Sequence, residues 1–108
     1  MTDAASHDAL TVEISPDHAM VVHGDIDIAG GPILETAILL HEREHSIVID
    51  LGDVFFIDSS GLRSLLGASR RARTRGSEVL LRAVGPEVRR ILDITGTADE
   101  FTFEDSSG

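Results

Sequence analysis

Hydrophobic residues follow two different spacings along this chain, and each spacing predicts its own kind of element. Short stretches that alternate or are wholly apolar predict strands, whereas apolar residues at i, i+3 and i+4 predict helices. In chain order we expect strands at 11–14 and 19–24 around a turn at 15–18, followed by a helix from 32 to about 44. A strand at 46–51, a helix at 60–74 and a strand at 78–83 come next. The last elements are a short helix that begins at 86 and ends at Gly96, and a strand at 101–103.

The order β-β-α-β-α-β-α-β joins an initial hairpin to alternating helices and strands. This alternation predicts an α/β fold, because parallel strands are connected through crossover helices. We therefore expect one α/β domain with a mixed, mainly parallel sheet of about four to five strands and three helices. The expected domain spans residues 11–104, after a disordered N-terminal segment (1–10) and before a tail (105–108).

The same spacings assign side chains to the core. In the first helix, Leu34 and Ile38 lie on the expected buried face, and Ile33 and Leu40 widen it. After the third strand, the run Phe55–Ile57 is expected to anchor the core, since large apolar residues are usually buried. These side chains would support the loop that follows them.

The composition narrows the available chemistry. The 108 residues include no cysteine, which excludes disulfides, zinc–thiolate sites and cysteine nucleophiles. The polar N-terminus does not resemble a signal peptide and no apolar run could span a bilayer, so we expect a cytoplasmic protein without a membrane partner. A net charge of −10 disfavours nucleic-acid binding. No cofactor is expected.

The charge is unevenly distributed. Residues 62–90 contain eight of the nine arginines and two acids, for a net charge of +6, while the rest of the chain carries −16. Such a dipolar surface suits a protein partner with complementary patches. Arg70, Arg71, Arg73 and Arg75 also fit a simpler interpretation as the solvated end of a helix, where cations are favoured.

The stretch Asp58-Ser59-Ser60-Gly61 stands between an apolar strand and a helical pattern. Asp58 or Ser59 is a suitable N-cap, because a short side-chain oxygen can accept from the free N–H groups of the first turn. A phosphate added to a hydroxyl here would lie in the favourable field of the helix N-terminus. The same four residues also make an ordinary helix start with no further role.

Asp25 and Asp27 follow the second strand, just as Asp58 and Ser59 follow the third. Loops beyond the carboxyl ends of parallel strands gather at one edge of the sheet, so we expect these two acidic loops to converge near one hydroxyl. Two carboxylates flanking Ile26 could bind a metal or act as an acid–base pair. The preferred interpretation is a polar loop whose aspartates cap turns.

Taken together, these segments resemble a STAS domain, in particular a bacterial anti-sigma factor antagonist. The resemblance runs from about residue 11 to 103, and its most specific part is the Phe56–Leu62 segment after an apolar strand. Further matching segments are 24–27, 47–51, 76–79, 88–92 and Thr95-Gly96. Arg63 and the early end of the chain depart from the pattern, since many relatives have a small residue after Leu62 and a longer last helix.

The resemblance implies a regulatory binding module rather than an enzyme. It implies that the unmodified protein binds an anti-sigma factor that is also a serine kinase, and so releases a sigma factor. That kinase would use its own bound ATP to phosphorylate Ser59, and a serine phosphatase would reverse the modification. The residues expected at the partner interface are Asp25, Asp27, Asp58, Ser59, Ser60, Gly61, Leu62 and Arg63.

Three alternatives stay open. The first is a scaffold or stressosome-like subunit that does not act directly in a sigma-factor cycle. The second is the cytoplasmic domain of an anion transporter, against which the missing membrane spans argue. The third is a hydrolase with Ser59 as nucleophile, although no histidine has an obvious spacing for a base and no Gly-x-Ser-x-Gly elbow is present.

Overall fold

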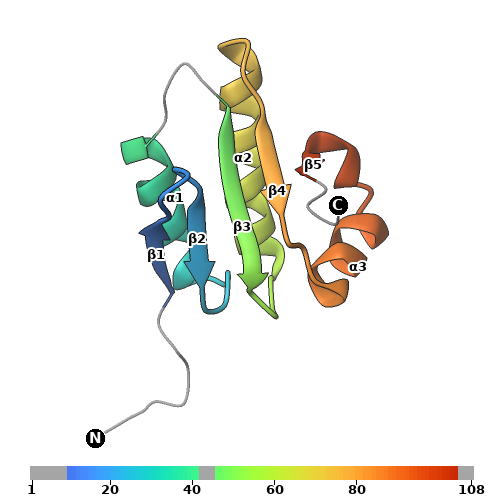
Figure 1. Cartoon of the computed structure of the whole chain (residues 1–108). Coiled ribbons are helices and arrows are strands. Elements are labelled where there is room, and N and C mark those ends of the chain that lie inside the picture. Colours follow the sequence, from blue (N-terminus) through green and yellow to red (C-terminus); the bar gives the residue numbers. More distant parts are fainter. Residues whose placement is uncertain (1–9, 42–45, 105–108) are drawn as a thin grey trace, which may run out of the picture.

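Strands and helices alternate along the chain in the computed structural model, which describes residues 10–41 and 46–104 (Figure 1). The predicted N-terminal segment up to residue 9, the predicted end of the first helix at 42–44 and the tail at 105–108 lie outside the described residues. The elements are β1 (Thr11–Ile14), β2 (Met20–His23), α1 (Gly30–His41), β3 (Ile47–Asp53), α2 (Ser59–Thr74), β4 (Val79–Arg82), α3 (Pro86–Ile94), a 3-10 helix (Ala98–Glu100) and β5 (Thr102–Glu104).

The described strands form one sheet in the order β1-β2-β3-β4-β5. β1 and β2 are an antiparallel hairpin, and the remaining neighbours are parallel. This arrangement confirms the predicted α/β class, the mixed sheet and the order of elements. The carboxyl ends of β2, β3 and β4 all point to the lower edge of the sheet in Figure 1, so the loops that follow them share that edge.

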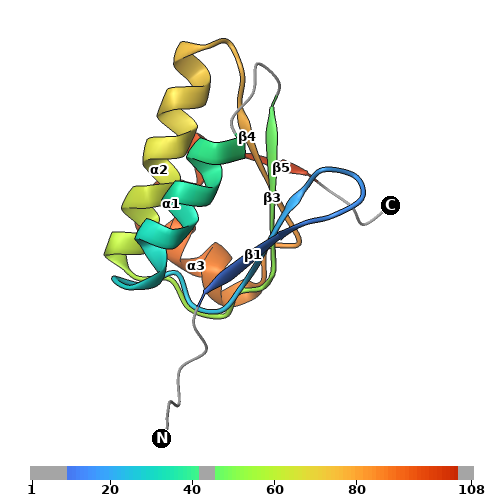
Figure 2. The same ribbon diagram turned by 90° about the vertical axis from the view of Figure 1, so that its left-hand side faces the viewer.

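The helices lie on one side of the sheet. Figure 2 shows the sheet edge-on, with α1 and α2 side by side on one face and α3 below them on the same side. Burial alternates along β3 and β4, because one face of each strand packs against these helices. The fully buried large side chains include Met20, Val22, Leu34, Ile38, Ile49, Leu51, Leu65, Leu81 and Leu92.

α1 buries a narrower stripe than the sequence predicts. Ile33 and Leu40, which were expected to widen the stripe, are 46% and 73% exposed. The prediction is wrong because α1 packs on the sheet and α2 from one side, which leaves the flanks of the helix in solvent. Leu10 differs in the opposite sense: assigned to the irregular N-terminal segment, it is buried and belongs to the core.

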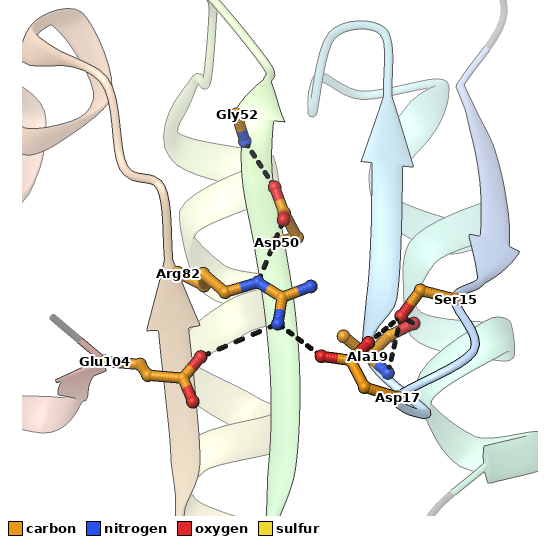
Figure 3. Close-up of polar contacts among 7 residues, drawn as sticks. All are labelled: Ser15, Asp17, Ala19, Asp50, Gly52, Arg82 and Glu104. Carbon is orange, nitrogen blue, oxygen red and sulfur yellow. Dashed lines mark hydrogen bonds and ion pairs between the residues drawn. The ribbon is translucent and has the colours of Figure 1, made fainter. Parts of the chain in front are cut away.

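The open face of the sheet carries an ionic cluster centred on Arg82 (Figure 3). Its Nε atom donates to Asp50 at 3.0 Å, and Nη1 donates to Asp17 at 2.8 Å and lies 3.8 Å from Glu104. Asp17 also accepts from the Ser15 hydroxyl. The hydrogen bond from Arg82, followed by that from Ser15, lowers the pKa of Asp17 to about 2. The cluster ties the β1–β2 turn to β3, β4 and β5 across the open face of the sheet.

α2 ends as predicted, because Gly76 just beyond it has a φ of 76°, a conformation that glycine adopts without a steric cost. No helix within residues 10–41 and 46–104 is both long enough and apolar enough to cross a membrane.

Candidate functional site

The start of α2 is fixed by Asp58. Its backbone is extended, and its side chain accepts a hydrogen bond from the Gly61 N–H at 2.9 Å. Its carbonyl accepts from the Leu62 N–H at 2.9 Å. Of the two caps that the sequence allowed, Asp58 is therefore the one used, and Ser59 becomes the first residue of the helix.

The two serines of this turn differ in access. Ser59 is exposed, and its hydroxyl forms no hydrogen bond with any residue that the structure describes. Ser60 is half-buried, and its carbonyl accepts from the Ser64 hydroxyl at 3.3 Å. An incoming protein therefore meets the Ser59 oxygen more readily than that of Ser60. The side chains of Phe55 and Phe56 do not enclose Ser59, since Ser59 itself is exposed.

The loops after β2 and β3 are joined to one another. The Ile26 N–H donates to the Phe56 carbonyl at 3.1 Å, and the Asp58 N–H donates to the Ile26 carbonyl at 3.2 Å. These bonds make a one-residue parallel bridge between Ile26 and Ile57, both of which are buried. The expected convergence of the two acidic loops is confirmed, and the loop that holds Asp25 and Asp27 is tied directly to the turn that holds Ser59.

Gly61 makes this close approach possible. A Cβ atom at this position would lie 2.5 Å from Cγ2 of Ile26 and closer still to the Ile26 carbonyl oxygen. Atoms of this kind essentially never approach within 3.0 Å, and the carbonyl belongs to the backbone and cannot rotate away. The glycine of the Asp-Ser-Ser-Gly turn is thus required by the contact between the loops.

The two aspartates of the first loop have different surroundings. Asp27 starts α1: its side chain accepts from the Gly30 N–H at 2.7 Å, and its carbonyl accepts from the Gly31 N–H at 2.7 Å. This confirms the preferred interpretation that Asp27 caps a turn. Asp25 is half-buried. Within the described ranges no cluster of three or more His, Cys, Asp or Glu side chains has a metal-binding arrangement, which gives the metal interpretation no support.

An apolar rim on these loops was missed at the level of sequence. Phe55 and Phe56, predicted to anchor the core, are 69% and 51% exposed, and Ile28 on the neighbouring loop is 74% exposed. The prediction is wrong because Val54 and Ile57 already occupy the core positions of this segment, so the two residues between them face outward. Three large apolar side chains near an exposed hydroxyl are a typical feature of a protein-binding surface.

The remaining predicted interface residues divide into buried and exposed groups. Gly61 and Leu62 are buried, so they support the turn and do not offer side chains to a partner. Arg63 is exposed and forms no ion pair with any described residue. The exposed residues of this region are therefore Ser59, Arg63 and the apolar rim (Ile28, Phe55 and Phe56), while Asp25, Asp27, Asp58 and Ser60 are half-buried.

A histidine bridge lies next to the first loop. His23, at the end of β2, contacts Asp53 through Nδ1 at 2.6 Å and Glu13 through Nε2 at 3.1 Å. The hydrogen bond with Asp53, and then that with Glu13, raises the pKa of His23 because both carboxylates stabilise the imidazolium. This bridge links β1, β2 and β3 on the face of the sheet opposite the helices.

Comparison with known proteins agrees with this geometry. Residues 9–108 match the family model for the STAS domain. An anti-sigma-B factor antagonist of Listeria monocytogenes is 32% identical over 99 residues, which cover 89% of this chain and 87% of that protein.

Solved structures give the same result. An anti-sigma factor antagonist from Mycobacterium paratuberculosis superposes with a TM-score of 0.69 at 30% identity, over 92% of this chain and 86% of that one. The Bacillus cell fate determinant SpoIIAA in its phosphorylated form superposes with a TM-score of 0.62 at 20% identity, over 91% and 93%. The latter likeness shows the fold alone.

The chain belongs to the STAS-domain family. Within this family its place is among the anti-sigma factor antagonists, the class of its Listeria relative. The resemblance that the Asp58–Gly61 turn suggested is thereby confirmed.

Proposed function

We propose that this protein binds, in the cytoplasm, an anti-sigma factor that is also a serine kinase, so that a sigma factor is released, and that phosphorylation of Ser59 ends this binding. The observation that carries the proposal is the exposed hydroxyl of Ser59 at the first residue of α2, beside the Asp25–Asp27 loop. The kinase would bring its own ATP, and a serine phosphatase would restore the unmodified form. The protein itself acts as a binding module and catalyses no reaction.

The first turn of α2 can accept a phosphate without refolding. The free N–H groups of the turn and the helix dipole favour negative charge at this position. A phosphoserine brings about −1.5 to −2 charges near neutral pH. Phosphorylation can therefore act locally, by changing the charge of the surface and leaving the fold as it is.

The same phosphate would weaken the binding of a partner at this surface. Asp25, Asp27 and Asp58 lie on the two joined loops, so the new charge adds to an acidic surface. In the unmodified protein the apolar rim supplies contact area, and the Ser59 hydroxyl can be buried at little cost. Taking the charged phosphate out of water in that interface would weaken binding, since buried charges that lack full pairing cost up to about 3–5 kcal/mol.

Phosphorylation is tested by incubating the protein with ATP and the serine-kinase anti-sigma factor of the same organism. Mass spectrometry should find one phosphate, located on Ser59. The Ser59→Ala variant should take up none, while the matched Ser60→Ala variant, which keeps the Ser59 hydroxyl, should still take up one phosphate. Phosphate on Ser60, or undiminished uptake by Ser59→Ala, would contradict the assignment.

Binding is tested by calorimetry with the same kinase in the presence of a non-hydrolysable nucleotide. Unmodified protein should bind at least about 100-fold more tightly than protein phosphorylated at Ser59, which corresponds to about 2.7 kcal/mol. A scaffold subunit outside a sigma-factor cycle would bind its partners equally in both states, or would not bind the kinase. Either result would exclude the proposed switch.

A further inference from the structure

Arg63 lies one helical turn beyond Ser59. Both residues belong to the regular part of α2, and both are exposed. Side chains at i and i+4 are neighbours on a helix, with Cβ atoms about 5–6 Å apart. Long helical side chains also lean toward the N-terminus of their helix, so the guanidinium of Arg63 can reach the turn that Ser59 occupies.

Arg63 differs from the arginines farther along α2. Arg70 and Arg73 form ion pairs with Glu100, and Arg71 lies 3.8 Å from Glu35. Arg63 has no ion pair with a residue in the part of the chain that the structure describes. Its charge is therefore available to a new group at the start of the helix.

We propose that Arg63 is the intramolecular counter-ion of a phosphate on Ser59. This inference rests on the proposed function, since it specifies how the phosphorylated form of that site is held. A guanidinium can donate two parallel hydrogen bonds to phosphate oxygens, which is the geometry that arginine offers and lysine does not. The Asp58 and Asp27 carboxylates compete less well than the phosphate for the Arg63 guanidinium, because they already accept the hydrogen bonds that cap α2 and α1.

The ion pair between Arg63 and the phosphate would also affect the binding of the partner. In the unmodified protein Arg63 can pair with a carboxylate of the anti-sigma factor. Once Ser59 is phosphorylated, Arg63 is turned to the phosphate on its own helix. Phosphorylation thus adds a negative charge to the interface and removes a positive one from it.

The test uses protein in which phosphoserine is incorporated at position 59 during translation, so that no kinase is needed. The pKa of the second phosphate ionisation is followed by phosphorus NMR in the wild type and in Arg63→Gln. An exposed ion pair of about 0.4 kcal/mol corresponds to a shift of about 0.3 pKa units, and we expect the phosphate pKa to be higher by that amount in Arg63→Gln. Arg63→Lys should retain part of the effect.

The matched control is Arg70→Gln, which removes the same charge from the same helix. Arg70 lies eleven residues beyond Ser59, or about 16 Å along the axis, which exceeds the screening length at physiological salt. The phosphate pKa should be unchanged in this variant. An unchanged pKa in Arg63→Gln, or equal shifts in Arg63→Gln and Arg70→Gln, would overturn the inference. Neither result bears on whether a kinase modifies Ser59, so the two proposals fail separately.

Discussion

Replacing Gly61 by alanine introduces one methyl group at the contact between the loops after β2 and β3. The new Cβ atom would lie 2.5 Å from Cγ2 of Ile26 and closer to its carbonyl oxygen. The two loops must separate by at least about 0.9 Å to bring the contact with Cγ2 to an ordinary van der Waals distance, and by more for the carbonyl oxygen, because interiors packed at crystal density cannot absorb such an overlap. The helix start and the Ile26 backbone are displaced relative to each other.

The expected loss of stability follows from the contacts that this separation breaks. The hydrogen bonds from Ile26 to Phe56 and from Asp58 to Ile26 are 3.1 and 3.2 Å long and stretch beyond bonding distance. Each contributes about 0.5–1.5 kcal/mol, and overpacking typically adds about 1–3 kcal/mol. We expect the free energy of unfolding of Gly61→Ala to fall by about 2–6 kcal/mol, a large part of the stability of a small domain.

The measurement is urea denaturation followed by circular dichroism, with Gly67→Ala as the matched control. Gly67 belongs to the same helix, and a Cβ atom there would meet only Nη1 of Arg71, at 3.5 Å. Alanine in an open helical position raises the free energy of unfolding by about 0.5–1 kcal/mol relative to glycine. The same substitution should therefore have opposite signs at two positions of α2 that are six residues apart.

The reasoning would be refuted by a Gly61→Ala protein that is as stable as the wild type. It would also be refuted if both variants were destabilised equally, since the effect would then belong to the helix as a whole.

Two further predictions concern charged groups on the open face of the sheet. The raised pKa of His23 contributes stability that is fully present below pH 6.5 and is lost as the pH rises through the folded-state pKa. The difference in unfolding free energy between wild type and His23→Gln should thus shrink between pH 6 and pH 9, and a constant difference would show that Glu13 and Asp53 do not act on the imidazolium. The lowered pKa of Asp17 contributes stability that is present above its ordinary value of 3.8 and is lost as the pH falls toward about 2. An NMR titration should show the Asp17 pKa rising toward 3.8 in Arg82→Gln, and an unchanged value would exclude Arg82 as the main cause.

Much of the fold could be predicted because the signals are local. The N-cap at Asp58 depends on one short side chain, and the end of α2 depends on Gly76 a few residues away. The convergence of the acidic loops also followed from sequence, since the direction of parallel strands determines which loops share an edge. These features need only the element order and the chemistry of the turns.

The exposed apolar residues could not be predicted in the same way. Hydrophobicity shows that Phe55 and Phe56 gain by leaving water, but it does not show which neighbours are there to cover them. In the folded chain Val54 and Ile57 occupy the core, and nothing described covers the residues between them. Hydrophobicity also predicts that Ile33 and Leu40 are buried, but the packing of α1 leaves both side chains exposed.

The ionic cluster had no sequence signal. Arg82 and Asp17 are 65 positions apart, and Asp50 was recognisable only as a polar residue near the end of an apolar strand. Their meeting depends on the register that places Asp50 opposite Arg82 between β3 and β4. Register across parallel strands is a property of the assembled sheet, and no short motif encodes it.

The strand order of the sheet is the same as the order of the strands in the chain. No strand has to enter between two others that are already paired, so the sheet can be extended at one edge while the polypeptide leaves the ribosome. Both loops of the candidate site, and the helix that begins at Ser59, are synthesised before β4. The serine and its surroundings can thus take shape on the nascent chain, with β4, α3 and β5 completing the far edge afterwards.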